Sequence, residues 1–221
     1  MNKRFKVNNV QIFCQYWQAL FAQLSSPTWS LAQHRACLDL LVQAYTEPQR
    51  AYHQCQHIVE CLQQFELVKN HLKDPLAVQL AIFFHDVVYW PRSQSNEQDS
   101  ATWMSAQLVN ALPQSQLDKI ATWILATQQH ACASDSDLAF LLDIDLAILA
   151  SDAARFAEYE QQIRHEYSWV DLATYQKKRA QVLHYFYQAN PLYQTQFFQQ
   201  HYEAQAKINL KQALISLNLM L

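Results

Sequence analysis

A histidine and an aspartate stand side by side in an otherwise apolar stretch of the chain, residues 80–89 (LAIFFHDVVY). Burying the imidazole of His85 and the carboxylate of Asp86 among apolar side chains is costly unless each polar group finds a partner. A divalent cation would be such a partner, because it keeps an aspartate ionised and a histidine neutral. A hydrogen bond between the two side chains would also satisfy them, so the pair alone leaves both interpretations open.

Two further pairs of polar residues are spaced so that a helix would bring them together. His53 and His57 are four residues apart, which on a helix places them on one face, one turn apart, where they can share a metal ion. Thr127 and His130 also share a helical face, just before an aspartate-rich turn. Taken alone, His53 and His57 also fit a half-exposed helix, and His130 also fits a surface or capping histidine.

Two aspartates interrupt a second apolar stretch, residues 140–149. Asp143 and Asp145 are two residues apart, so a helix points them in different directions and only one is expected to face a shared site. The alternative is that one of them caps the helix or pairs with an arginine such as Arg155 or Arg164.

The elements that carry these residues are predicted to be helices. The 221 residues include no glycine and only six prolines, whereas tight hairpins and phosphate-binding loops rely on glycine. Alanine, leucine and glutamine are abundant and favour helices, and 51% hydrophobic residues are enough for a packed core. We therefore expect an all-α fold and, since no segment resembles an interdomain linker, a single domain over residues 1–221.

Apolar residues at steps of three and four, together with capping signals, predict where the helices begin and end. Ser30 is a predicted N-cap, and Asp74 followed by Pro75 predicts the start of the helix that ends in the His-Asp pair. The expected helices cover about residues 10–24, 31–46, 50–65, 75–86, 97–110, 115–129, 136–150, 153–167, 171–189 and 191–218.

Composition excludes several classes of protein. The net charge is −3, with only 16 lysines and arginines, so the chain lacks the basic surface of a nucleic-acid binder. Five cysteines without a CxxC pair indicate reduced residues of an intracellular protein rather than a disulfide framework. The sequence contains neither a long apolar run nor a signal-peptide pattern, which predicts a soluble, cytoplasmic protein without a membrane partner.

Taken in chain order, six sequence pieces resemble the HD-domain superfamily of metal-dependent phosphohydrolases. The signature of that superfamily is a histidine, a later His-Asp doublet and a distant aspartate. The chain closely resembles a bacterial group of predicted HD phosphohydrolases over a motif-bearing core of about residues 50–167, which implies a single HD-type helical bundle with additional N- and C-terminal helices. The pieces are YHxxxHI at 52–58, FHDVVY at 84–89, NExxSA at 96–101, ATxxH at 126–130, LDIDL at 142–146 and IRxEY at 163–167.

The resemblance implies a metal ion held by four ligands: His57, His85, Asp86 and Asp145. Two imidazoles and two carboxylates suit Mn²⁺, Fe²⁺, Co²⁺, Ni²⁺, Zn²⁺ or Mg²⁺, and the ligand types do not choose among these ions. His53 and His130 are candidates for contacting the phosphate or for holding a second metal.

The implied reaction is hydrolysis of a small phosphorylated molecule, by family analogy a nucleotide. Asp86 would be catalytic as well as a ligand, and Glu97 is the candidate for proton transfer, although it also fits an ordinary acidic residue in the first turn of a helix. Asn96 is a candidate substrate contact or an N-cap. Phosphoryl transfer also calls for cationic side chains at the site, and the candidates are Arg164, which lies in a matching piece, together with Arg50, Arg92, Lys178 and Arg179.

Two other functional classes fit the same sequence. One is a non-catalytic sensor that binds a metal ion or a nucleotide and signals through a partner. The other is a structural helical bundle whose His-Asp pairs are satisfied internally. An apolar terminal segment, residues 213–217, would either form a homodimer contact or close the core.

Overall fold

The computed structural model describes residues 3–24 and 28–219, and every regular element in these ranges is a helix. The predicted all-α class is therefore confirmed. The chain divides into two compact units, residues 1–131 and 132–221, and the expectation of a single domain stays a prediction. Within the described ranges, no helix combines the length and the apolar character needed to cross a membrane.

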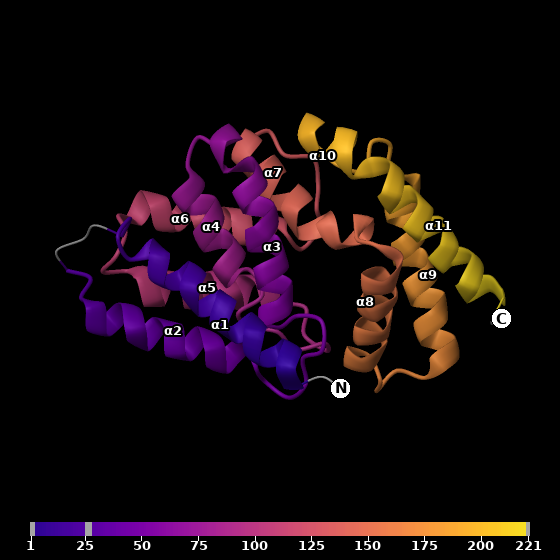
Figure 1. The fold of residues 1–221 in the computed structure, drawn as a ribbon, viewed down its shortest axis with the longest axis horizontal. Helices are drawn as coiled ribbons and strands as arrows, with labels where there is room; N and C mark the ends of the chain where they lie inside the picture. The colour runs from indigo at the N-terminus through magenta and orange to yellow at the C-terminus, as the bar shows by residue number, and fades with distance from the viewer. Residues whose placement is uncertain (1–2, 25–27, 220–221) are drawn as a thin grey trace. The chain divides into compact units, whose positions relative to one another are not determined.

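The first unit is built around one helix, α4, which is labelled in Figure 1. Residues 77–84 of α4 are all buried, and the helix packs against α3, α5 and α6. Its high apolar content matches a helix that is covered on every side. The helices of this unit are α1 Lys3–Leu20, α2 Leu31–Tyr45, α3 Cys55–Val68, the 3₁₀ turn η1 Lys69–His71, α4 Pro75–Phe84, α5 Asn96–Leu108 and α6 Gln114–Ala126.

The predicted helix starts at Ser30 and Asp74 are both confirmed. The Ser30 hydroxyl accepts from the backbone N–H of Gln33, whose own side chain accepts from the Ser30 N–H, which completes a capping box. Asp74 accepts from the backbone N–H of Ala77, and Pro75 occupies the first helical position.

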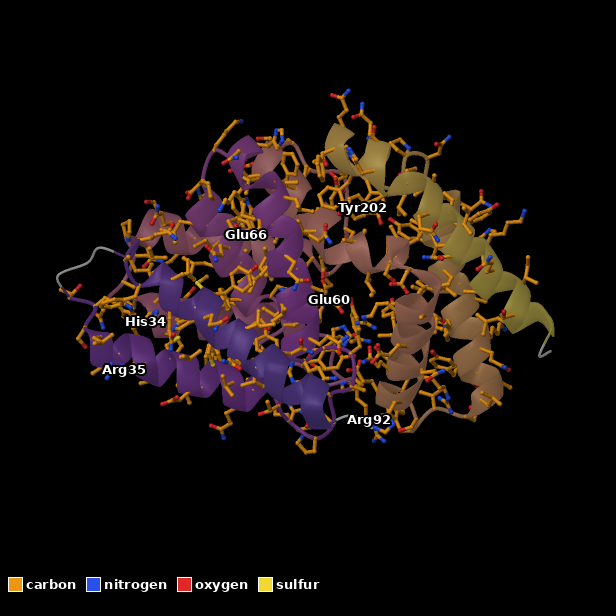
Figure 2. The ribbon with its side chains drawn as sticks, viewed as in Figure 1. His34, Arg35, Glu60, Glu66, Arg92 and Tyr202 are labelled. Atoms are coloured by element: carbon orange, nitrogen blue, oxygen red, sulfur yellow. The ribbon has the colours of Figure 1, made fainter. Side chains whose placement is uncertain are left out.

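Aromatic side chains fix the C-terminal end of α4. The ring of Phe83 lies 5.1 Å from the rings of both Phe13 and Trp17, and the Tyr45 hydroxyl donates to the Phe83 carbonyl at 2.9 Å. On the other side of Trp17, His34 (labelled on α2 in Figure 2) stacks at 5.1 Å. The turn that follows α4 therefore begins at a helix end that is held in place by aromatic packing.

The second unit is held together by its last helix. α11 packs against α9, α10 and η2, and the Asn209 amide donates to the carbonyls of Leu149 and Ser151 at 2.9 and 2.8 Å. The elements of this unit are α7 Ser136–Asp145, the 3₁₀ turn η2 Leu146–Ala150, α8 Ala153–Glu166, α9 Leu172–Gln188, α10 Gln196–His201 and α11 Glu203–Leu219.

Three predicted helices differ clearly from the structure. The helix expected over 10–24 spans Lys3–Leu20. The helix expected from residue 50 begins only at Cys55. The helix expected over 191–218 is divided into α10 and α11. The carboxylate of Glu203 accepts from the backbone N–H groups of Leu192 and Tyr193 at 2.9 and 3.2 Å, and these long-range bonds hold the segment before α10 out of a helix.

Asp143 also holds the segment before α10 in place, by accepting hydrogen bonds from it. Its carboxylate is buried and accepts three hydrogen bonds of 2.7 Å, from the Gln194 N–H, the Thr195 N–H and the Thr195 hydroxyl. Burial nevertheless raises the pKa of Asp143 to about 6. Asp143 is therefore a structural residue of the second unit.

Replacing Asp143 with asparagine is expected to lower the free energy of unfolding by about 1–3 kcal/mol, because an amide N–H would face the Thr195 donor. The wild-type aspartate has a higher pKa in the folded than in the unfolded chain, so its contribution is present below about pH 4 and lost as the pH rises through about 6. The loss caused by Asp143→Asn should accordingly be larger at pH 4 than at pH 7. Urea unfolding of both proteins checks this, and an equal loss at both pH values would contradict the raised pKa.

Candidate metal centre

Two histidines meet where the first turn of α3 approaches the end of α4. His57 lies in that first turn and His85 directly follows α4; their exposed fractions are 2% and 3%. Their Nε2 atoms are 3.1 Å apart. Because metal–nitrogen bonds are about 2.1 Å long, this separation suits two neighbouring ligands of one ion.

Asp86 brings a carboxylate oxygen to the same point. Its Oδ2 lies 3.0 Å from His85 Nε2 and 3.5 Å from His57 Nε2, and the side chain is only 15% exposed. The three atoms form a triangle like three adjacent ligands of a metal ion with open positions. The first unit thus brings together three of the four predicted metal ligands.

The charge state of Asp86 favours cation binding. Burial alone would raise the pKa of this carboxyl, but the charges of His85 and His53 and hydrogen bonds from His57 and His85 outweigh it and hold the pKa well below its usual range. Asp86 is therefore ionised at neutral pH. A ligand that is already an anion need not release a proton before it binds a metal ion.

The second nitrogen of each imidazole has its own partner. His85 Nδ1 lies 3.0 Å from the Ile82 carbonyl oxygen, and since that oxygen can only accept, Nδ1 carries a proton. His57 Nδ1 lies 3.7 Å from the Cys61 thiol. Such partners orient metal-binding histidines, and here they leave Nε2 of each ring directed at the Asp86 carboxylate. Each Nε2 therefore faces the carboxylate either as a proton donor or, without its proton, as a possible metal ligand.

His53 lies beside this triangle but not where the spacing predicted. Because α3 begins at Cys55, the prediction that His53 and His57 share one helical face is wrong. Their ring centroids are 6.0 Å apart, and the His53 ring instead stacks on Tyr89 at 4.0 Å. His53 is held in a turn, close enough for its charge to lower the pKa of Asp86.

Arg50 joins the two turns that carry the site. Its side chain is fully buried, and NH1 donates to the carbonyls of His53 and Asp86 at 3.0 and 2.6 Å, while NH2 donates to that of Val87 at 2.8 Å. Nε donates to Glu47 at 3.1 Å. The guanidinium therefore links the turn before α3 to the turn after α4, and a phosphate contact by Arg50, one of five candidate cations, stays a prediction.

Replacing Arg50 with methionine is expected to lower the free energy of unfolding by about 2–4 kcal/mol, because three backbone carbonyls and Glu47 lose their donor. Arg35, exposed on α2 (Figure 2), provides the matched control, since Arg35→Met removes a cation from the same unit without such bonds. Chemical denaturation of both variants measures the difference. Equal stability of the two variants would contradict the role given to Arg50.

Asn96 and Glu97 begin α5, which is tied to the turn that follows Asp86. The Asn96 amide accepts from the Trp90 N–H at 3.0 Å and donates to the Trp90 carbonyl at 3.1 Å, so it closes a loop and is not the N-cap, which is Ser95. The Ser100 hydroxyl accepts from the Val88 N–H at 3.1 Å. Glu97 lies between these two anchors, half-buried, and no described residue forms a hydrogen bond or ion pair with it.

His130 and Arg164 are two further predicted substrate contacts. His130 follows the C-terminal end of α6, and Arg164 lies in the last turn of α8. α6 ends at Ala126 and His130 adopts a left-handed φ of 49°, so the prediction that Thr127 and His130 share a helical face is wrong. Arg164 donates from NH1 to the carbonyls of Tyr167 and Val170 at 2.8 and 3.1 Å, which closes the C-terminus of α8. A substrate contact by either residue stays a prediction.

Asp145 is the last residue of α7 in the second unit and is half-buried. Asp143, two residues earlier, is buried and engaged by Gln194 and Thr195 rather than by an arginine. Asp143 is thus occupied within the second unit, and the expectation that only one of the two aspartates faces a shared site stays a prediction.

Sequence reasoning did not find the roles of Arg50 and Tyr89. The only sequence signal for a role of Tyr89 was its place in the FHDVVY piece.

Comparisons with protein-family models, with curated proteins and with solved structures return no match to this chain.

Proposed function

We propose that this chain is an HD-type, metal-dependent phosphohydrolase that acts on a small phosphorylated molecule. The observation that carries the proposal is the convergence of His57 Nε2, His85 Nε2 and Asp86 Oδ2, which lie 3.0–3.5 Å from one another. Asp145 is proposed as the fourth ligand because of its place in the LDIDL piece. A divalent ion held by these residues would supply Lewis-acid activation of water and neutralise charge on the phosphoryl group.

The remaining residues have distinct proposed roles. Glu97 accepts a proton from the attacking water; it is half-buried, on a helix anchored to the turn after Asp86. His53, stacked on Tyr89, contacts the phosphate through its ring edge. Asn96 has one amide hydrogen left for a substrate after its bond to Trp90.

Nucleotides are the substrate class we propose to test first, with sugar phosphates as the second. A cytoplasmic location is part of the proposal, and its support is that all five cysteines are free. The rival function, a metal-dependent sensor without catalysis, uses the same three ligands and differs only in the outcome of the assay.

Phosphate release by the full-length protein tests the proposal. Protein stripped with a chelator and reloaded with Mn²⁺ or Co²⁺ would be assayed on nucleoside phosphates and sugar phosphates, beside Asp86→Asn. We expect wild-type turnover of at least one substrate and only background release by the variant. Equal release by both proteins contradicts the proposed enzyme, and metal binding without release favours the sensor.

A further inference from the structure

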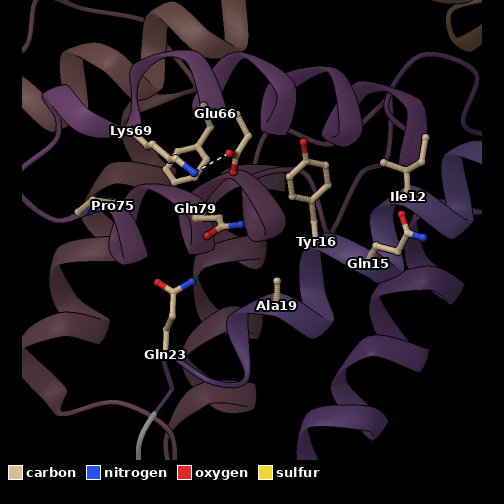
Figure 3. Close-up of a pocket in the computed structure, with 10 residues that line it drawn as sticks. Ile12, Gln15, Tyr16, Ala19, Gln23, Glu66, Lys69, Pro75 and Gln79 are labelled. Carbon is tan, nitrogen blue, oxygen red and sulfur yellow. Dashed lines mark hydrogen bonds and ion pairs between the residues drawn. The ribbon is translucent and has the colours of Figure 1, made fainter.

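A pocket of about 630 Å³ opens in the first unit between α1, the end of α3 and the start of α4 (Figure 3). Ile12, Phe65 and Pro75 form apolar parts of its wall. Its volume lies within the range of small-molecule sites. Phe65 is eight residues beyond His57, about 12 Å along α3, so the pocket is separate from the candidate metal centre.

Gln79 is the unusual residue of this pocket. It is the one polar side chain among the buried residues 77–84 of α4, with an exposed fraction of 5%, and it lines the cavity. None of the described residues forms a hydrogen bond with its amide. Figure 3 shows the amide projecting into the pocket, in the view between Lys69 and Tyr16. The amide atoms are open to the pocket rather than sealed inside the protein, so water or a molecule in the pocket supplies their hydrogen bonds.

The charges around Gln79 indicate a neutral partner. Glu66 and Lys69, the two charged residues of the lining, form an ion pair of 2.7 Å and offset each other. Burial, together with the charge of Glu66, raises the pKa of Tyr16, so its hydroxyl stays protonated. A free anion such as phosphate would have to break the ion pair to gain a cation.

The hydrogen-bonding groups of the Gln79 carboxamide further restrict the kind of molecule that can bind. Its oxygen accepts and its nitrogen donates, side by side in one plane, so it matches a planar edge with one donor beside one acceptor. Tyr16 and Phe65 offer aromatic surface for a flat ring.

We propose that this pocket binds a neutral, planar small molecule whose edge carries a neighbouring hydrogen-bond donor and acceptor, with Gln79 as its two-point partner. Nucleobases and primary carboxamides share this edge. The site is independent of the proposed phosphohydrolase activity, because none of its residues belongs to the metal centre.

Calorimetric titration of the full chain tests the proposal with four probes: uracil, adenine, nicotinamide and N,N-dimethylnicotinamide. We expect one-to-one binding of a nucleobase or of nicotinamide, while the dimethyl analogue, which keeps the ring but lacks the donor, does not bind. If only the bases bind, the ligand class is a nucleobase; if only nicotinamide binds, the ligand class is a primary carboxamide.

Two variants make the test specific. Gln79→Leu keeps the volume but removes both hydrogen-bonding atoms, and should weaken binding about tenfold or more; Gln63→Leu, exposed on α3, should leave it unchanged. Without a probe, Gln79→Leu should melt close to the wild-type temperature, because no hydrogen bond to a described residue is lost. Absence of binding by all probes, or equal binding by Gln79→Leu, overturns the proposal, and a lowered melting temperature would show that Gln79 is structural.

Discussion

Replacing Asp86 with asparagine is expected to weaken binding of a divalent ion by at least about 100-fold, since even residues that only support metal ligands are worth 10–100-fold. The change keeps the shape of the side chain but removes the negative charge that offsets the cation. It also leaves the Nε2 atoms of His57 and His85 3.1 Å apart without an anion beside them. Metal-dependent turnover should fall to background.

The control for this prediction is Asp39→Asn, which removes an exposed carboxylate from α2 of the same unit. Both variants would be titrated with Mn²⁺ and Zn²⁺ after chelator treatment, with unfolding curves recorded alongside. Retained wild-type affinity in a folded Asp86→Asn protein would exclude Asp86 as a ligand.

Replacing Glu97 with glutamine is expected to lower kcat by about 10²–10⁴-fold, the usual contribution of a positioned general base. Metal content should not change, because Glu97 is not among the converging ligands. Single-substrate kinetics of the metal-loaded protein measures kcat, and elemental analysis measures the metal content.

The variant Asp99→Asn is the control that tells a catalytic role of Glu97 from the general effect of a negative charge at the start of a helix. Asp99 lies in the same first turn of α5, so a merely electrostatic contribution to the helix would respond similarly in both variants, by about 0.3–1 kcal/mol of stability. We expect only Glu97→Gln to change kcat. Comparable kcat in wild type and Glu97→Gln would remove Glu97 from the mechanism.

Local signals predicted the helices well wherever a cap or a proline acts on its nearest neighbours. Ser30 and Asp74 bond to backbone groups three residues away, so their effect is visible in the sequence. The start of α4 was predicted for the same reason. Helix ends set by distant partners were missed, as at residues 50–54, where Arg50 bonds to carbonyls 36 and 37 positions later.

In the candidate site, too, features set by neighbouring residues were predicted and features set by distant contacts were missed. The His-Asp pair was conspicuous because two ionisable residues interrupt an apolar run, and the structure brings His57 to that pair. The place of His53 was missed because ring stacking on Tyr89, not helical spacing, holds it. Gln79 could not have been singled out, since a glutamine in a helix carries no sign that its amide faces a pocket formed with α1 and α3.

The most direct test of the central claim is the metal content of the full-length protein, measured by elemental analysis after purification without chelator and again after chelator treatment and reloading. We predict about one transition-metal ion per chain in the wild type, lost in Asp86→Asn. A folded wild-type protein that carries no ion and binds none at millimolar Mn²⁺, Co²⁺ or Zn²⁺ would contradict the account.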